Sequence, residues 1–236
     1  MNRFHRGRHG LLGAISELEI TIEDEMWHSI TPERIAREHA RAFNSVTDFG
    51  VILDPFCGYG TDTLYQGRGF VAIDCDILFG RLVNARRIHS IIGTGPVEFV
   101  CADFVRGKSC FRTGELFDIV YLSPPWGHRG IRNRKHEPDA FGTRRLNQLT
   151  VDGTQVFERA LKMVRLDNIA YYLPRGMAED ELIRLAILTK ESRMISAQVH
   201  YSFDPNDETK PKESQLRVRG VTVLFGNLSR YLLKCS

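Results

Sequence analysis

Residues 51–60 read Val51-Ile52-Leu53-Asp54-Pro55-Phe56-Cys57-Gly58-Tyr59-Gly60, and this stretch decides the fold. Its first three residues are an apolar run that predicts a buried strand, and its two glycines predict a tight turn directly after that strand. Because glycine has no Cβ and tolerates positive φ, the backbone of such a turn can pass close to a ligand. The acidic residue Asp54, at the end of the strand, adds to the pattern of a ligand-binding α/β domain.

The rest of the chain continues this pattern. From residue 51 onward, strand patterns alternate with helical ones, which favours a parallel sheet with crossover helices. The expected strands are 51–54, 70–74, 97–101, 119–122, 168–173, 194–201 and 218–225, and the expected helices are 31–43, 62–67, 78–91, 152–165 and 178–190. A loop, not a helix, joins the last two strands. The prediction is therefore an α/β fold with a seven-stranded, mostly parallel sheet and a terminal antiparallel hairpin.

The first expected helix marks a domain boundary. Thr31 is a good N-cap, Pro32 suits the first helical position, and Ile35, His39 and Phe43 then fall on one face. We expect residues 1–30 to be a short N-terminal extension and residues 31–236 to be one Rossmann-like domain. A chain of 236 residues is long enough for one sizeable domain of this kind.

Composition bounds the class of protein. The five cysteines show no paired spacing, which argues against a disulfide framework or a structural zinc site, and the eight histidines show no ligand spacing. No apolar run is long enough to span a membrane, and no signal peptide is visible. We expect a soluble intracellular protein with no metal ion and no membrane contact.

The net charge of +3 is unevenly distributed. Basic residues gather in the segment 129–145, which follows a Pro-Pro-Trp turn. Lys and Arg neutralise phosphates, so this segment suggests a polyanionic substrate, although a solvated loop would have the same composition.

Acidic residues follow the first three expected strands. Asp74 ends the second strand, where a carboxylate can accept hydrogen bonds from both ribose hydroxyls. Asp76 is a rival for this role, but Asp74 ends the apolar run directly. After the third strand, Asp103 is placed to accept from an adenine amino group and Phe104 to pack on the ring. Together with Gly58 and Gly60, these residues predict a site for an adenosine-containing cofactor.

A second turn, Ser123-Pro124-Pro125-Trp126, follows the apolar strand 119–122. A glycine-rich turn and a later small-polar-Pro-Pro-aromatic turn form the two-part signature of an amino-group methyltransferase. The first part holds S-adenosylmethionine and the second a planar exocyclic amine. The Ser123 hydroxyl and the Pro124 carbonyl can accept hydrogen bonds from the amine, which directs its lone pair to the sulfonium methyl. The prolines stiffen the turn and remove competing N–H donors.

Trp126 offers a large aromatic face to the substrate. Trp is the strongest aromatic partner for a cation. The 7-methylguanine ring is positively charged, whereas an unmodified base is not. Trp126 therefore hints at a cap-type substrate.

With these motifs in place, the chain resembles the trimethylguanosine synthase family, which methylates the guanine 2-amino group of 7-methylguanosine RNA caps. The resemblance covers about residues 24–232, and the order and spacing of its blocks are more specific than any one block. The blocks are Glu25–Glu33, Asp54–Gly60, Ala72–Asp76, Asp103–Phe104, Ser123–Gly127 and Tyr172–Arg175.

The resemblance implies a class I S-adenosylmethionine-dependent methyltransferase fold and a capped RNA or cap nucleotide as partner. It implies that the catalytic turn holds the amine through Ser123 and Pro124, and that Trp126, beside Pro125, stacks on the 7-methylguanine. Arg175 is implied to reach the cap phosphates. Nuclear or cytoplasmic residence is also expected from the resemblance. It implies that Thr31, Asp54, Asp74 and Asp103 bind S-adenosylmethionine. With the residues of the glycine turn and the adenine site, the expected cofactor-binding residues are Thr31, Asp54, Phe56, Gly58, Gly60, Asp74, Asp103 and Phe104.

The chain departs from the family on the acceptor side. Arg86-Arg87-Ile88 stands where the family usually has a paired Asn, and His128 replaces the second glycine after the Pro-Pro-Trp turn. These departures leave open whether one or two methyl groups are added. The sequence does not specify the RNAs or any protein partners.

Two other hypotheses remain. One is an amino-methyltransferase on DNA or internal RNA bases, but such enzymes typically have Asp or Asn before Pro-Pro and Tyr or Phe after it. Ser123 and Trp126 argue against that class. The other is a non-catalytic cap- or RNA-binding module, which would not bind S-adenosylmethionine.

Overall fold

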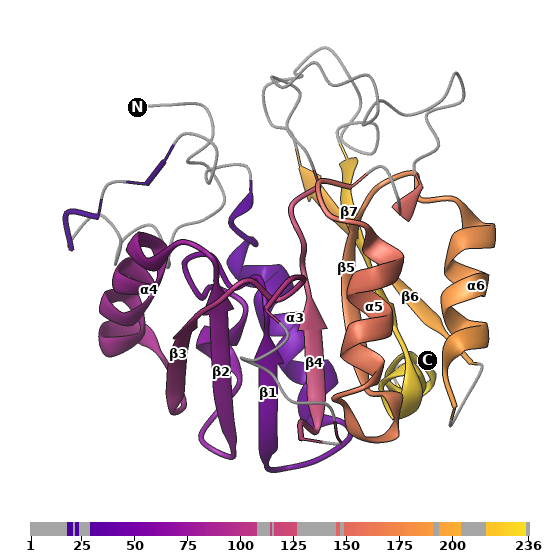
Figure 1. Cartoon of the computed structure of the whole chain (residues 1–236), viewed down its shortest axis with the longest axis horizontal. Helices are drawn as coiled ribbons and strands as arrows, with labels where there is room; N and C mark the ends of the chain where they lie inside the picture. Colours follow the sequence, from indigo (N-terminus) through magenta and orange to yellow (C-terminus); the bar gives the residue numbers. More distant parts are fainter. Residues whose placement is uncertain are drawn as a thin grey trace.

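The computed structural model describes residues 18–20, 22–23, 29–107, 114, 116–126, 145–146, 149–190, 194–203 and 216–234. Within these ranges the chain forms a seven-stranded sheet in the order β3-β2-β1-β4-β5-β7-β6, with helices on both faces (Figure 1). The strands are β1 Gly50–Asp54, β2 Phe70–Asp76, β3 Val97–Cys101, β4 Ile119–Leu122, β5 Ile169–Pro174, β6 Ser196–Phe203 and β7 Leu216–Leu224.

The α-helices are α3 Glu33–Asn44, α4 Phe79–Ile92, α5 Gly153–Leu161, α6 Glu179–Leu188 and α7 Tyr231–Lys234, and the 3-10 helices are η2 Thr63–Tyr65, η5 Arg165–Asp167 and η7 Gly226–Arg230. None of the helices in these ranges is long and apolar enough to cross a membrane.

Strand pairing confirms the predicted fold class. Strand β1 pairs in parallel with β2 and β4, and β4 pairs in parallel with β5. Strand β7 lies antiparallel between β5 and β6, so the last hairpin inserts its second strand into the sheet. This is the seven-stranded arrangement with a terminal antiparallel hairpin that the sequence predicts.

The central strands alternate their side chains between two cores. Leu53 and Val120 belong to the core that also contains residues of α5 and α6. Ile52 and Tyr121, the adjacent residues, pack with Phe43 of α3 on the other face. Both faces are apolar because helices cover both, as expected for parallel strands with crossover helices. At about 25 cal/mol per Å² of buried apolar area, this two-sided burial is the main stabilising contribution to the fold.

Two predicted helices are wrong in extent. The helix expected at 62–67 is the 3-10 turn η2 alone, and the helix expected at 152–165 ends at Leu161 before η5 begins at Arg165. The backbone at Val164 explains the second difference, because it is extended, with a φ of −99° and a ψ of 144°. Such a conformation cannot continue an α-helix.

The predicted cap of the first helix is also wrong by one residue. Pro32, not Thr31, is the N-cap of α3, and no side chain caps the helix. The Pro32 carbonyl accepts the first hydrogen bonds, from the backbone N–H groups of Ile35 and Ala36. Proline disfavours helical geometry in the residue before it, so Thr31 lies outside the helix. The domain boundary at residues 30 and 31 stays a prediction.

Gly226 gives a test of the fold. It has a φ of 62°, and a Cβ built there would lie 2.2 Å from the Leu166 carbonyl oxygen. We expect Gly226→Ala to lower the free energy of unfolding by about 3 kcal/mol, measured by urea denaturation. The matched control is Gly80→Ala in α4, where a Cβ meets nothing within 4 Å. That change should be neutral or stabilise by up to about 1 kcal/mol. Equal unfolding midpoints for the two variants would mean that the turn at Gly226 tolerates a side chain.

Candidate active site

The carboxyl ends of β1, β2 and β4 meet at one edge of the sheet. Asp54 pairs in register with Asp74, and Leu53 pairs with Val120 three positions before Ser123. The sheet order runs outward from β1 through β2 on one side and from β4 through β5 on the other. This reversal point is where open α/β sheets bind their ligands. Both predicted motifs, the glycine turn and the Pro-Pro-Trp turn, begin here.

The glycine turn is tied to the neighbouring strand. Gly58 and Gly60 have φ values of 56° and 69°, a region that favours glycine. The Gly58 N–H donates to Asp76 Oδ2 at 3.1 Å, and the Cys57 N–H donates to the Cys75 carbonyl at 2.9 Å. A Cβ on Gly60 would lie 2.9 Å from Asp74 Oδ2. The turn is therefore packed directly against the end of β2.

Two buried carboxylates lie below this turn, and each has an unused oxygen. Asp54 and Asp74 both have 0% of their surface exposed. Asp54 Oδ1 accepts from the Phe56 N–H at 3.0 Å, and Asp74 Oδ2 accepts from the Thr63 hydroxyl at 2.9 Å. Their other oxygens, Asp54 Oδ2 and Asp74 Oδ1, have no hydrogen-bond partner in the described part of the chain. Unpartnered buried acceptors are rare and point to a ligand that would donate to them.

Burial also changes the pKa values of Asp54 and Asp74. It raises the pKa of Asp54 well above its ordinary value, and the negative charges of Asp74 and Asp62 raise it further. Burial raises the pKa of Asp74 to about 7, although the Thr63 hydrogen bond acts in the opposite direction. These carboxylates are therefore poised to respond to a cationic or hydrogen-bond-donating ligand.

Asp76, the rival of Asp74, has a different environment. Its Oδ2 accepts from Gly58 and its Oδ1 accepts from the Leu78 N–H at 2.8 Å. Both oxygens are thus engaged by the backbone of the two turns that flank the strand end. Asp76 shapes the glycine turn, whereas Asp74 keeps an unused acceptor.

The predicted adenine contacts lie at the end of β3. Asp103 is half-buried, and its Oδ1 accepts from the N–H groups of Val105 and Arg106. Phe104 is only 2% exposed and packs edge-on against Phe56, with ring centroids 5.8 Å apart. Phe56, on the glycine turn, is only partly buried. The structure thus places Phe104 in the core and Phe56 between that core and the surface.

The Pro-Pro-Trp turn leaves the same edge of the sheet. Ser123 is half-buried, Pro124 is buried and Pro125 is exposed. The Trp126 indole N–H donates to the Tyr172 carbonyl at 3.2 Å, and the two rings are tilted by 60° with centroids 4.9 Å apart. Trp126 remains half-buried, so one strand neighbour fixes the ring while part of its surface stays open.

Two further predicted residues flank this edge. Arg175 is exposed and directly follows β5, the strand that anchors Trp126. Thr31 is 3% exposed, and its neighbour Ile30 packs with Tyr59 of the glycine turn. The departures at Arg86 and Arg87 lie on α4, whereas His128 and most of the basic segment lie outside the described residues. Arg145, at the end of that segment, forms ion pairs with Asp180 at 3.1 Å and Glu181 at 2.9 Å.

A set of buried polar side chains was not predicted from the sequence. His39 Nδ1 lies 3.1 Å from Asp62 Oδ1, and His89 Nε2 lies 3.3 Å from Thr63 Oγ1. One signal was available, because His39 falls on the apolar face of the first helix. A buried histidine there requires a polar partner, but the sequence does not say which one. Among the described residues, no group of three or more His, Cys, Asp or Glu side chains could hold a metal ion.

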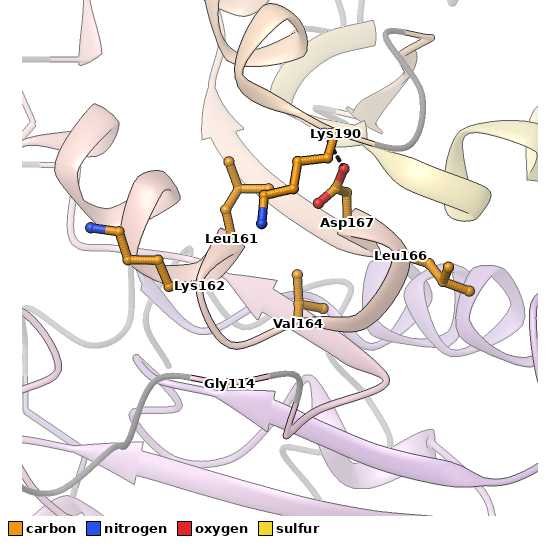
Figure 2. Close-up of a pocket in the computed structure, with 7 residues that line it drawn as sticks. All are labelled: Gly114, Leu161, Lys162, Val164, Leu166, Asp167 and Lys190. Carbon is orange, nitrogen blue, oxygen red and sulfur yellow. Dashed lines mark hydrogen bonds between the residues drawn. The ribbon is translucent and has the colours of Figure 1, made fainter.

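A cavity of about 160 Å³ lies elsewhere, near the start of β5. Figure 2 shows that it is lined by the ends of α5 and α6 and by the turn before β5. The Lys190 backbone N–H donates to the Asp167 carboxylate at its rim. None of the predicted site residues lines this cavity, so it belongs to the opposite end of the sheet from the candidate site.

The fold and the site define a class of protein. A methyltransferase from Agrobacterium tumefaciens, described as SAM dependent, is similar over 84% of this chain and 63% of its own, with a TM-score of 0.57 and 13% identity. The N-methyltransferase NodS from Bradyrhizobium japonicum, solved with S-adenosylhomocysteine, matches 92% of this chain and 98% of its own, with a TM-score of 0.52 and 12% identity. This chain therefore has the α/β fold of these methyltransferases.

Sequence comparison gives the family. Residues 49–209 match the model of the RNA cap guanine-N2 methyltransferase family, and the chain belongs to that family. Trimethylguanosine synthase of Schizosaccharomyces pombe is 26% identical over 188 residues, which cover 77% of this chain and 74% of that protein. Trimethylguanosine synthase of Saccharomyces cerevisiae is 25% identical over 187 residues, which cover 77% of this chain and 57% of that protein. The predicted resemblance is thereby confirmed.

The raised pKa of Asp74 predicts a pH dependence of stability without cofactor. The folded-state pKa of Asp74 is about 7, above its ordinary value of 3.8, so folding favours the protonated carboxyl. The contribution of this group to the free energy of unfolding is fully present below pH 3.8 and is lost as the pH rises through about 7. The thermal midpoint of wild type should therefore fall more between pH 5 and pH 8 than that of Asp74→Asn. The matched control is Asp48→Asn, an exposed carboxylate before β1, which should keep the wild-type difference. An equal fall in all three proteins would contradict the assignment.

Proposed function

We propose that this chain transfers a methyl group from S-adenosylmethionine to the 2-amino group of 7-methylguanosine in RNA caps. The product is 2,7-dimethylguanosine and, after a second transfer, 2,2,7-trimethylguanosine. The observation that carries the proposal is the place of Trp126, half-buried and anchored to β5, at the sheet edge that also holds the buried carboxylates. Membership of the cap guanine-N2 methyltransferase family supports the same substrate class.

The residues at the carboxyl ends of β1 and β2 fit S-adenosylmethionine. The oxygens of Asp54 and Asp74 that have no partner among the described residues are acceptors for its ammonium and hydroxyl groups. We assign the ribose to Asp74 because both oxygens of Asp76 are engaged by backbone N–H groups. Asp103 and Phe56 border the adenine site, with Phe104 behind Phe56, and Thr31 and Gly58 complete it. When bound, S-adenosylmethionine supplies an electrophilic methyl group.

The acceptor side positions the guanine amine. Pro124 is buried and rigid, so the Ser123 hydroxyl and the Pro124 carbonyl are held at the end of β4. Accepting hydrogen bonds from the amine leaves its lone pair directed at the methyl group. Trp126, flanked by Pro125, stacks on the cationic base. Positioning of this kind can supply about 7–11 kcal/mol in favourable cases, so no strong base is required.

Arg175 completes the proposed site. Arg175 is exposed and directly follows β5, the strand whose Tyr172 carbonyl accepts from the Trp126 indole N–H. Arginine recognises phosphates through two parallel hydrogen bonds. We assign it to the cap phosphates, and we expect the enzyme to meet capped RNA in the nucleus or the cytoplasm.

The direct test is methyl transfer from labelled S-adenosylmethionine to 7-methylguanosine triphosphate, with guanosine triphosphate as the control. Transfer only to the methylated nucleotide supports the proposal, and chromatography of the products counts the methyl groups. Cofactor binding without transfer to either nucleotide would direct attention to internal RNA or DNA bases. Absence of cofactor binding would favour a non-catalytic RNA-binding module.

Trp126→Ala should abolish cap methylation while S-adenosylmethionine affinity stays within about threefold, because the proposed cofactor contacts come mainly from the ends of β1, β2 and β3 and not from this ring. Trp126→Phe is the matched control, since it keeps an aromatic face and loses only the indole N–H bond to Tyr172. We expect it to retain measurable activity with a higher KM for the cap. Equal loss of cofactor affinity and methylation in Trp126→Ala would mean that Trp126 is structural.

Arg175→Ala should raise the KM for the capped nucleotide by about tenfold, in line with loss of a charged hydrogen bond of about 1.5–3 kcal/mol. The KM for S-adenosylmethionine should not change. Lys162→Ala removes another exposed cation, at the far end of the sheet, and serves as the control. Unchanged cap kinetics in Arg175→Ala would remove Arg175 from the phosphate site.

A further inference from the structure

A chain of buried polar side chains runs from the glycine turn to the far strands of the sheet. His39 of α3 lies between Asp62, 3.1 Å from its Nδ1, and Thr222 of β7, 2.7 Å from its Nε2. His200 of β6 lies 2.7 Å from the same Thr222 hydroxyl. His39 is 1% exposed and Asp62 is 5% exposed. The contacts therefore join the cofactor edge to the last hairpin through the protein interior.

The chemistry of these groups sets the direction of one hydrogen bond. An ionised carboxylate can only accept, so His39 Nδ1 carries the proton that is donated to Asp62 Oδ1. The Thr222 hydroxyl holds the other ring nitrogen, which prevents the imidazole from rotating away. A histidine that is fixed at both nitrogens fixes the carboxylate in turn. Asp62 is thus held in one orientation beside the glycine turn.

Asp62 lies between the glycine turn and Thr63, whose hydroxyl donates to Asp74 at 2.9 Å. Its negative charge raises the pKa of Asp54, at the end of β1, and that of the Tyr121 hydroxyl, on β4 two residues before Ser123. For both groups, burial is the larger cause. The methyl group must pass between these two strand ends, since the cofactor carboxylates lie at one and the amine acceptors at the other. Asp62 therefore lies at the strand ends where the proposed cofactor carboxylates are.

Few basic side chains lie near the carboxyl groups of Asp54, Asp62 and Asp74 in the described part of the chain. In the described part of the chain, the only side chains within ion-pair distance of Asp54, Asp62 or Asp74 are His39 and His89. Two carboxylate oxygens there also have no hydrogen-bond partner. No described cluster suits a metal ion. Ionising buried carboxyl groups together is unfavourable unless a cation balances them, which is why their pKa values are raised, and bound S-adenosylmethionine would supply a sulfonium cation.

We propose that Asp62, oriented by His39, is a further cofactor-binding residue that recognises the sulfonium charge, so that the site prefers S-adenosylmethionine over S-adenosylhomocysteine. The product has a neutral thioether, so transfer of the methyl group removes the attraction and favours product release. This inference rests on the use of S-adenosylmethionine and not on the cap as substrate. Its test therefore uses the two cofactor forms alone.

The experiment is isothermal titration calorimetry of the full chain with S-adenosylmethionine and with S-adenosylhomocysteine. Asp62→Asn keeps an acceptor for His39 and removes only the charge. We expect its affinity for S-adenosylmethionine to fall by about tenfold or more, with a change of less than about threefold for S-adenosylhomocysteine. Asp118→Asn is the control, because Asp118 binds the Val51 N–H and Arg165 at the start of β4. It should keep the wild-type ratio of the two affinities.

Two His39 variants test the orienting role. Asparagine places its amide N–H where Nδ1 stands, so His39→Asn keeps the donor to Asp62 and should keep the ratio within about threefold. Glutamine reaches the Nε2 position and bonds Thr222 instead, so His39→Gln should lower the ratio by about tenfold. Each ratio comes from one preparation, so partial unfolding does not change it. An unchanged ratio in Asp62→Asn, or an equal loss for both ligands, would overturn the proposal, whatever substrate the enzyme uses.

Discussion

Parallel backbone pairing between β1 and its neighbours β2 and β4 fixes where the chemically important side chains lie. The register that places Asp54 opposite Asp74 brings the glycine turn and two carboxylates to one edge of the sheet. The pairing of β1 with β4 brings the Ser123–Trp126 turn to the same edge. Shifting either pairing by one residue would move these side chains to the other face. The two apolar cores that cover the sheet are what make such a shift unfavourable.

Electrostatics at this edge oppose stability in the absence of a ligand. Asp54 and Asp74 are fully buried, and burial raises the pKa of both. Hydrogen bonds from the Phe56 N–H and the Thr63 hydroxyl offset part of this cost. The remaining acceptors suit the cationic and hydroxyl-bearing cofactor that the class of enzyme uses. An unfavourable electrostatic contribution of this kind is the usual consequence of preparing a binding site for a charged ligand.

The acceptor side depends on a different kind of contact. Trp126 is positioned by the Tyr172 carbonyl and ring, which belong to β5, so the order of strands determines where the aromatic face lies. Tyr172 in turn packs against His39 and His200, with ring centroids 5.7 Å away in each case. The same buried aromatic and histidine group therefore borders both the base-stacking residue and the carboxylate Asp62. The cofactor and acceptor halves of the site share one supporting structure.

The sequence by itself determined the fold class, the approximate extents of all seven strands and the residues of both motifs, because apolar periodicity, glycine turns and the Pro-Pro dipeptide are local signals. It misplaced the cap of α3 and overextended two helices. Pro32 and the extended backbone at Val164 act through backbone geometry that periodicity does not report. Only the tertiary structure decided the partner of His39, the difference between Asp74 and Asp76, and the anchoring of Trp126. Each of these depends on atoms that lie far apart in the chain and meet only when the sheet assembles.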